Sequence, residues 1–210
     1  MSRSLASLKL YCQAVLSEQV SPWLYDPKAL PVPWRSNMIQ PAGRKLRFGM
    51  IMGNDGETTV HPPISRGLEL TKAALEAAGH TVFPWRPLNH PDMARTMNSS
   101  FYTLGGAAIL GLTRQHDEPV FGSMKEYERV YELGEEGSLG PTKLREMITK
   151  RNAFQKQYLD AWTGMEGGMD AIIAPVSPWT APRLGVTQDL GVFHVDFTGV
   201  WNLLGMFSFT

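Results

Sequence analysis

A short loop carries the side chains in this sequence that are best suited to binding a small molecule. Ser177, Trp179 and Thr180 supply two hydroxyls and an aromatic wall, and Pro175, Pro178 and Pro182 stiffen the loop. The loop follows an apolar run, 169–175, that has the composition of a buried strand. Ligands of parallel α/β sheets collect at the carboxyl ends of strands, and stiff apolar walls with few polar groups form small-molecule pockets. A pocket wall and a plain surface loop fit this pattern equally well.

The sequence lacks the usual motifs of nucleophilic and metal-dependent catalysis. It has no Gly-x-Ser-x-Gly, and none of its five histidines pairs with another at i, i+4 around a glutamate. His80 follows a glycine that ends a helix, so we expect a structural role in capping carbonyls; His61 is expected in a turn. Glutamates 126, 128, 132, 135 and 136 could bind a metal, but a solvated helix and loop is the simpler interpretation. We therefore expect no metal and no cofactor.

Composition restricts the class of protein and its partners. The sequence has 20 Lys and Arg residues and 20 Asp and Glu residues, so its formal net charge is zero. It lacks the cluster of basic residues that is typical of a nucleic-acid binder, so we expect no nucleic-acid partner. No apolar segment approaches the roughly 18 residues of a membrane span, and no signal peptide is visible, so no membrane partner is expected either. Cys12, the single cysteine, is expected to be a buried inert thiol rather than a nucleophile, as in a reducing, cytoplasmic protein.

The elements that must position the loop follow an α/β pattern. Residues 46–52 and 81–85 have the character of strands, and a helix over 64–78 lies between them. This strand–helix–strand spacing predicts a parallel pair with a right-handed crossover. The run 169–175 would add a third strand.

Further helices are expected over 4–16, 92–112 and 141–162. The first begins with little room for a cap, the second would pack closely around Gly105-Gly106, and Thr142 could cap the third. The third also carries an apolar stripe along one side, formed by Leu144, Met147, Ile148, Phe154, Tyr158 and Trp162 together with Arg151. Residues 21–41 are rich in proline and read as an extended connector, held to a surface by aromatic side chains. Asn202 stands in an apolar stretch and is expected to be buried, where it would hold a neighbouring loop.

Several segments, taken in order, resemble the amidase signature family, especially its fungal acetamidase-like members. Met1-Ser2-Arg3-Ser4 resembles the family's Gly-Pro-Met-x-Arg-Ser segment, entered at its methionine. The other matching segments are Pro22-Trp23, Pro33-Trp34-Arg35, Phe48-Gly49-Met50, Asp55-Gly56, His61-Pro62-Pro63, Ala78-Gly79-His80, 169–175 and Trp201-Asn202-Leu203-Leu204-Gly205. The resemblance covers nearly the whole chain.

The resemblance implies a mixed β-sheet flanked by helices, and hydrolysis of a carboxamide through an acyl-enzyme. The family uses a serine nucleophile, a second serine in a cis peptide and a lysine base. None of these can be assigned here, because they would precede the segment that matches Met1, and Asn98-Ser99-Ser100 is a different context. At the other end, Met206-Phe207-Ser208 stands where the family has a proline followed by another strand. A missing strand would leave a sheet edge and an apolar patch exposed.

We therefore expect one partial amidase domain over 1–210, with a helix in 1–20, the connector in 21–45 and the α/β portion in 46–210. The chain would be an amidase fragment, inactive alone, that carries scaffold and substrate-binding residues. These are Ser177, Trp179, Thr180 and Trp201. Its partner would be a small amide, and a homo-oligomer is left open. The alternative is a non-catalytic remnant that acts as a small-molecule-binding or interaction module.

Overall fold

A computed structural model describes residues 2–36, 43–53, 57–101, 103–133, 137–183 and 196–206. Asp55, Gly56, Glu135, Glu136 and Phe207-Ser208, discussed above, lie outside these ranges. The chain divides into two compact units, Met1–Arg44 and Lys45–Thr210. The division falls at the end of the proline-rich connector, and the assignment of both units to one partial domain stays a prediction.

The first unit contains helix α1, Leu5–Val15, and a short 3-10 turn η1, Pro22–Leu24. The helix has its cap, contrary to expectation: the Ser4 hydroxyl accepts a hydrogen bond from the Ser7 amide, which satisfies one of the free N–H groups of the first turn. No residue of α1 is buried, and Cys12 is half-buried rather than buried. This unit therefore has little core of its own among its described residues.

The second unit is built on a three-stranded parallel sheet. Strand β1, Arg47–Met50, lies between β2, Thr81–Pro84, and β3, Ala171–Ile173. In register, Gly49 stands opposite Phe83 on one side and opposite Ile172 on the other. The sequence therefore predicted the strands and their parallel direction correctly, although β3 is shorter than the apolar run that contains it.

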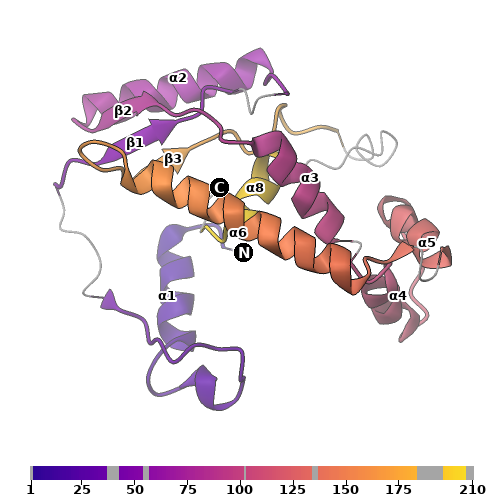
Figure 1. Cartoon of the computed structure of the whole chain (residues 1–210). Helices are drawn as coiled ribbons and strands as arrows, with labels where there is room; N and C mark the ends of the chain where they lie inside the picture. The colour runs from indigo at the N-terminus through magenta and orange to yellow at the C-terminus, as the bar shows by residue number, and fades with distance from the viewer. Residues whose placement is uncertain are drawn as a thin grey trace. The chain divides into compact units, whose positions relative to one another are not determined.

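Helix α2, Pro62–Ala77, makes the crossover from β1 to β2, as Figure 1 shows. Prolines at its first positions cost no hydrogen bond, because those N–H groups have no partner within a helix. Gly79 (φ 80°) ends it in the left-handed region. His80 is structural, as expected, but its Nδ1 accepts from the Leu46 amide at 3.2 Å instead of capping carbonyls.

The single helix expected over 92–112 is two helices. Helix α3 spans His90–Ser100 and α4 spans Ala107–Arg114. Gly105 and Gly106, with φ of 58° and 76°, interrupt the helical conformation between α3 and α4, because a right-handed helix needs negative φ. The glycine pair was interpreted as a close-packing site inside a helix, and that interpretation is wrong. A turn η3, Gly122–Met124, and helix α5, Lys125–Glu132, follow.

Helix α6, Pro141–Thr163, is the longest element, and Phe154 and Tyr158 are its buried residues. Gly140, not Thr142, stands at its N-cap, and no side chain caps it. Helix α8, Asp196–Leu204, packs against α3 and α6, as both views show. The core between these helices and the sheet consists of Ile51, Trp85, Met93, Phe154, Tyr158, Met169, Val200, Leu203 and Leu204. In the described part of the chain, no helix is both long and apolar enough to cross a bilayer.

Candidate substrate-binding region

A cavity of about 890 Å³ lies between strand β3 and helices α6 and α8. Its walls are residues 170–176, three residues of α6 (Gln155, Leu159, Trp162), three of α8 (Thr198, Trp201, Leu204) and the following Gly205 and Met206. Apolar side chains predominate. The volume is within the range of small-molecule sites.

The cavity runs along the backbone edge of β3. Seven consecutive residues, 170–176, line it, whereas one face of a strand presents only every second residue. β3 pairs with β1 on its other side, and the described residues provide no strand beyond it.

Trp201 is held in the cavity wall by a buried aromatic cluster. Its ring meets His90 edge-on, with centroids 5.4 Å apart, and Tyr158 edge-on at 6.0 Å. The Tyr158 hydroxyl lies 2.5 Å from His90 Nε2 and accepts a longer hydrogen bond, 3.4 Å, from Trp85 Nε1. Tyr158 and His90 are buried, at 0% and 4% exposure. Burial disfavours the phenolate and raises the pKa of Tyr158 to about 12, while the Trp85 hydrogen bond opposes this shift.

The loop after β3 is fastened to the start of α2. The His61 amide donates to the Pro178 carbonyl at 2.7 Å, and the rings of His61 and Trp179 lie 6.4 Å apart. His61 was expected in a turn; it is instead the N-cap residue of α2, and its carbonyl accepts from the amides of Ile64 and Ser65 in the first helical turn. The Ser177 hydroxyl accepts from the Trp179 amide at 3.4 Å.

The four predicted substrate-binding residues therefore occupy two places. Ser177 and Trp179 are half-buried together beside His61, and Thr180 is exposed next to them. Trp201, on α8, lines the cavity together with Pro175 and Val176 of the loop after β3. Their role in binding stays a prediction.

Sequence reasoning did not single out Trp162 and Leu159 as cavity residues. Trp162 was recognised as part of the apolar stripe of α6, but a stripe does not reveal whether it faces core or cavity. Asn202 is exposed rather than buried, so its expected role in holding a loop is wrong. It lies at the end of α8, where its carbonyl accepts from the Gly205 amide.

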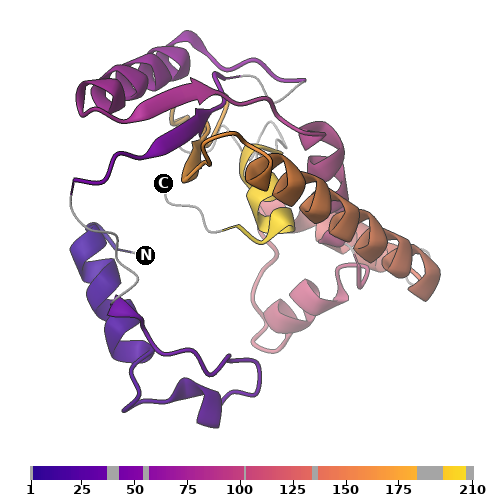
Figure 2. The ribbon, with the colours of Figure 1, turned by 60° about the vertical axis from the view of Figure 1, so that its left-hand side comes forward.

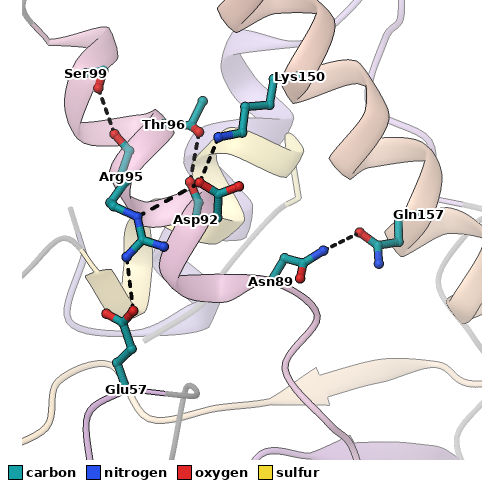
Figure 3. A network of polar contacts seen from close by, with 8 residues as sticks. All are labelled: Glu57, Asn89, Asp92, Arg95, Thr96, Ser99, Lys150 and Gln157. Carbon is teal, nitrogen blue, oxygen red and sulfur yellow. Dashed lines mark hydrogen bonds and ion pairs between the residues drawn. The ribbon is translucent and has the colours of Figure 1, made fainter.

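A polar network joins α3, α6 and the segment before α2 (Figure 3). Asp92 accepts from Lys150 Nζ at 2.7 Å, and Arg95 bonds Glu57 at 3.0 Å while approaching Asp92 at 3.9 Å. These side chains are 42–62% exposed. Ion pairs this exposed contribute little stability, so the network mainly orients the segments that it joins.

The described residues contain no group of three or more His, Cys, Asp or Glu side chains arranged to hold a metal ion. Among the described lysines, Lys45 bonds the Ala78 carbonyl, Lys150 bonds Asp92 and Lys156 bonds Asp160, and none of these contacts is to a serine hydroxyl. No serine–lysine pair of the kind implied by the resemblance is therefore formed within the described ranges.

The chain resembles known amidases along its whole length. The family model for amidases matches residues 1–210. Acetamidases from Emericella nidulans and Aspergillus oryzae are 32% and 33% identical over 95% of the chain. A solved fatty acid amide hydrolase superposes on 97% of the chain with a TM-score of 0.75 at 26% identity.

The chain spans about 38% of each acetamidase and 34% of the fatty acid amide hydrolase. The partial α/β sheet with flanking helices is thus a portion of the fold found in that structure. With the family model, the two relatives and the superposition in agreement, the chain belongs to the amidase family.

Proposed function

We propose that the protein containing this chain hydrolyses a small carboxamide to a carboxylic acid and ammonia or an amine, and that this chain supplies scaffold and part of the substrate-binding wall. The observation that carries the proposal is the match to two acetamidases over 95% of the chain. The enzyme nucleophile attacks the acyl carbon, the C–N bond breaks and the nitrogen leaves with a proton; water then adds to the acyl-enzyme, releasing the acid and restoring the nucleophile. The nucleophile and base for these steps are assigned to sequence outside the 210 residues.

The loop after β3 is the proposed substrate wall. It leaves the carboxyl end of a strand in a parallel sheet, where ligands collect. The 2.7 Å bond from the His61 amide to the Pro178 carbonyl fixes its backbone, and Trp179 presents a large side chain beside two hydroxyls. Such a wall selects by shape, and one methylene more or less in the substrate is worth only about 1–3 kcal/mol.

The activity is tested with ammonia release from a series of primary amides of increasing acyl length. The 210-residue chain alone is expected to give no turnover above buffer, while the full-length protein is expected to give saturable turnover. Saturable ammonia release by the isolated chain would refute the assignment of catalysis to other segments. No turnover of any amide by a folded full-length protein would refute the amidase proposal.

The wall is tested in the full-length protein with Trp179→Ala. We expect the ratio of kcat/KM between short and long amides to change by about tenfold, with a small effect on melting temperature. Trp201→Ala is the matched comparison, because Trp201 packs on buried His90 and Tyr158 and should also lower the melting temperature. A large fall in melting temperature for Trp179→Ala, with unchanged substrate ratios, would show that the residue is structural.

A second function, small-molecule binding without catalysis, is favoured by the 890 Å³ apolar cavity. It predicts saturable binding of amides to a folded full-length protein that does not turn them over. Calorimetric titration beside the ammonia assay separates the two functions.

We also propose a cytoplasmic location, without nucleic-acid partners, because the chain has one cysteine and zero formal net charge. Cell fractionation with a tagged full-length protein tests the location, and recovery in a secreted or organellar fraction would refute it. Sedimentation of the purified protein would decide the open question of a homo-oligomer.

A further inference from the structure

A second, smaller cleft of about 230 Å³ lies where α3, α6 and the end of α8 meet. The last turn of α8 separates this cleft from the larger cavity beside β3. Gln155, which borders both, donates its side-chain amide to the carbonyls of Leu203 and Leu204 and so ties α6 to that turn. The cleft walls are apolar and adaptable, formed by Met97, Met147, Ile148 and Leu203.

One cation faces these apolar walls. Arg151 lines the cleft and interrupts the apolar stripe of α6, one turn before buried Phe154 and two turns before buried Tyr158. Among the described residues, the hydrogen-bond partner of the Arg151 guanidinium is the neutral Asn152 side chain, at 3.3 Å, and no carboxylate lies within ion-pair distance of it. The nearby carboxylate of Asp92 is engaged by Lys150 at 2.7 Å. A guanidinium has five N–H donors, so Arg151 keeps most of them for a ligand.

The remaining polar groups add a donor but no competing charge. Asn202 lines the cleft and is exposed, so its side-chain amide can donate to a bound oxygen. The Ser100 hydroxyl already donates to the Met97 carbonyl at 2.6 Å, which leaves its oxygen as an acceptor. A cleft with a planar cation, an amide and four apolar walls is complementary to an anion that carries a short hydrocarbon tail.

We propose that the cleft between α3, α6 and α8 binds a short-chain aliphatic carboxylate, with the carboxylate on Arg151 and Asn202 and the tail against the two methionines. The volume suits an acid of about four to six carbons. Acids of this class are also products of the hydrolysis proposed above. The site itself does not depend on that hydrolysis, because binding is measured directly.

The test is a titration of the longest expressed form of the protein, with ¹³C-methyl methionine, against sodium butyrate at constant ionic strength. We expect the methyl signals of Met97 and Met147 to shift and saturate with a Kd of about 1 mM, while uncharged 1-butanol, which an amidase cannot convert to butyrate, leaves them unchanged. Arg151→Gln should weaken butyrate binding about tenfold or more. The matched control, Arg145→Gln, removes the same charge from an exposed position of α6 outside the cleft and should bind like the parent.

Three results would overturn the proposal: no shift of these methyl signals up to about 50 mM butyrate, equal shifts with 1-butanol, or equal weakening by both arginine substitutions. The dispersion of the methyl signals reports whether each variant is folded. If Arg151→Gln does not fold, Arg151→Lys takes its place, with several-fold weakening expected because a lysine cannot make the two-point contact. Unchanged binding in that variant would count against the site.

Discussion

Removing one oxygen atom from the aromatic cluster should destabilise the protein at neutral pH and change how its stability depends on alkali. Tyr158→Phe leaves the ring in place but deletes the hydroxyl that contacts His90 Nε2 at 2.5 Å and Trp85 Nε1 at 3.4 Å. A buried polar group that loses its partner costs about 1–3 kcal/mol. The Trp85 contact is long, and the Leu88 backbone is a third partner of the hydroxyl, so we assign most of the loss to His90 and Leu88 together and expect about 2 kcal/mol at pH 7. For a domain of this size, that lowers the melting temperature by roughly 4–8 °C.

The alkaline behaviour follows from the raised pKa of Tyr158. Below about pH 10 the phenol is neutral in both folded and unfolded states, so its stabilising contribution is complete. Between pH 10 and the folded-state pKa of about 12, the unfolded phenol ionises first, and the contribution is lost as pH rises. The loss is about 1.4 kcal/mol per pH unit, or on the order of 3 kcal/mol in all. The advantage of the parent over Tyr158→Phe should therefore fall below about 1 kcal/mol at pH 11.

Urea unfolding at pH 7, 9 and 11 measures both effects, with near-ultraviolet circular dichroism as the signal. Tyr131→Phe is the matched control, because it removes the same atom from a side chain that is 38% exposed, and it should change stability by less than about 0.5 kcal/mol. Equal stability of Tyr158→Phe and the parent at pH 7 would refute the assignment of a buried hydrogen bond. Parallel alkaline slopes for the two proteins would refute the raised pKa.

Gly106→Ala should lower the free energy of unfolding by about 2 kcal/mol or more in thermal melts, because φ is 76° and a Cβ would lie 2.5 Å from the Tyr127 carbonyl oxygen. Gly111→Ala, which places a methyl group in open space inside α4, should instead raise the free energy of unfolding by about 0.5–1 kcal/mol. If both substitutions changed the free energy of unfolding in the same direction, the interpretation of Gly106 as a helix break would be contradicted. Asp92→Asn should cost less than about 1 kcal/mol by urea unfolding, and the cost should vanish in about 1 M NaCl because the ion pairs are exposed. A larger or salt-independent loss would mean that Asp92 has a role beyond its ion pairs.

The strands of the second unit could be predicted because their signals are local. A strand, a helix with prolines at its start and glycine after its end, and a second strand form a βαβ unit whose direction and handedness follow from backbone sterics. The same kind of signal identified α6 from its apolar spacing. Helix boundaries at Gly105-Gly106 were missed because glycine tolerates both helical and left-handed φ. Gly106 adopts the left-handed φ where it lies close to the Tyr127 backbone, a tertiary contact that the local sequence does not show.

The site could be predicted only in part. The loop 176–182 was identified from its composition, and its backbone attachment to His61 joins residues more than 100 positions apart, which no local pattern reveals. Asn202 was misplaced because an apolar neighbourhood in sequence does not fix which side of a helix faces solvent. The cavity residues of α6 and β3 lie beside each other through packing alone.

By itself the sequence determined the class of fold, the order of the elements and the family, because hydrophobic spacing, turn residues and an ordered set of motifs are encoded along the chain. Tertiary structure decided that Trp201 stands on His90 and Tyr158 in a cavity wall, that Trp179 lies beside His61, and that Arg151 faces a separate apolar cleft. These relationships join segments far apart in sequence. They depend on which side chains exclude water together, and that is a property of the packed chain rather than of any one segment.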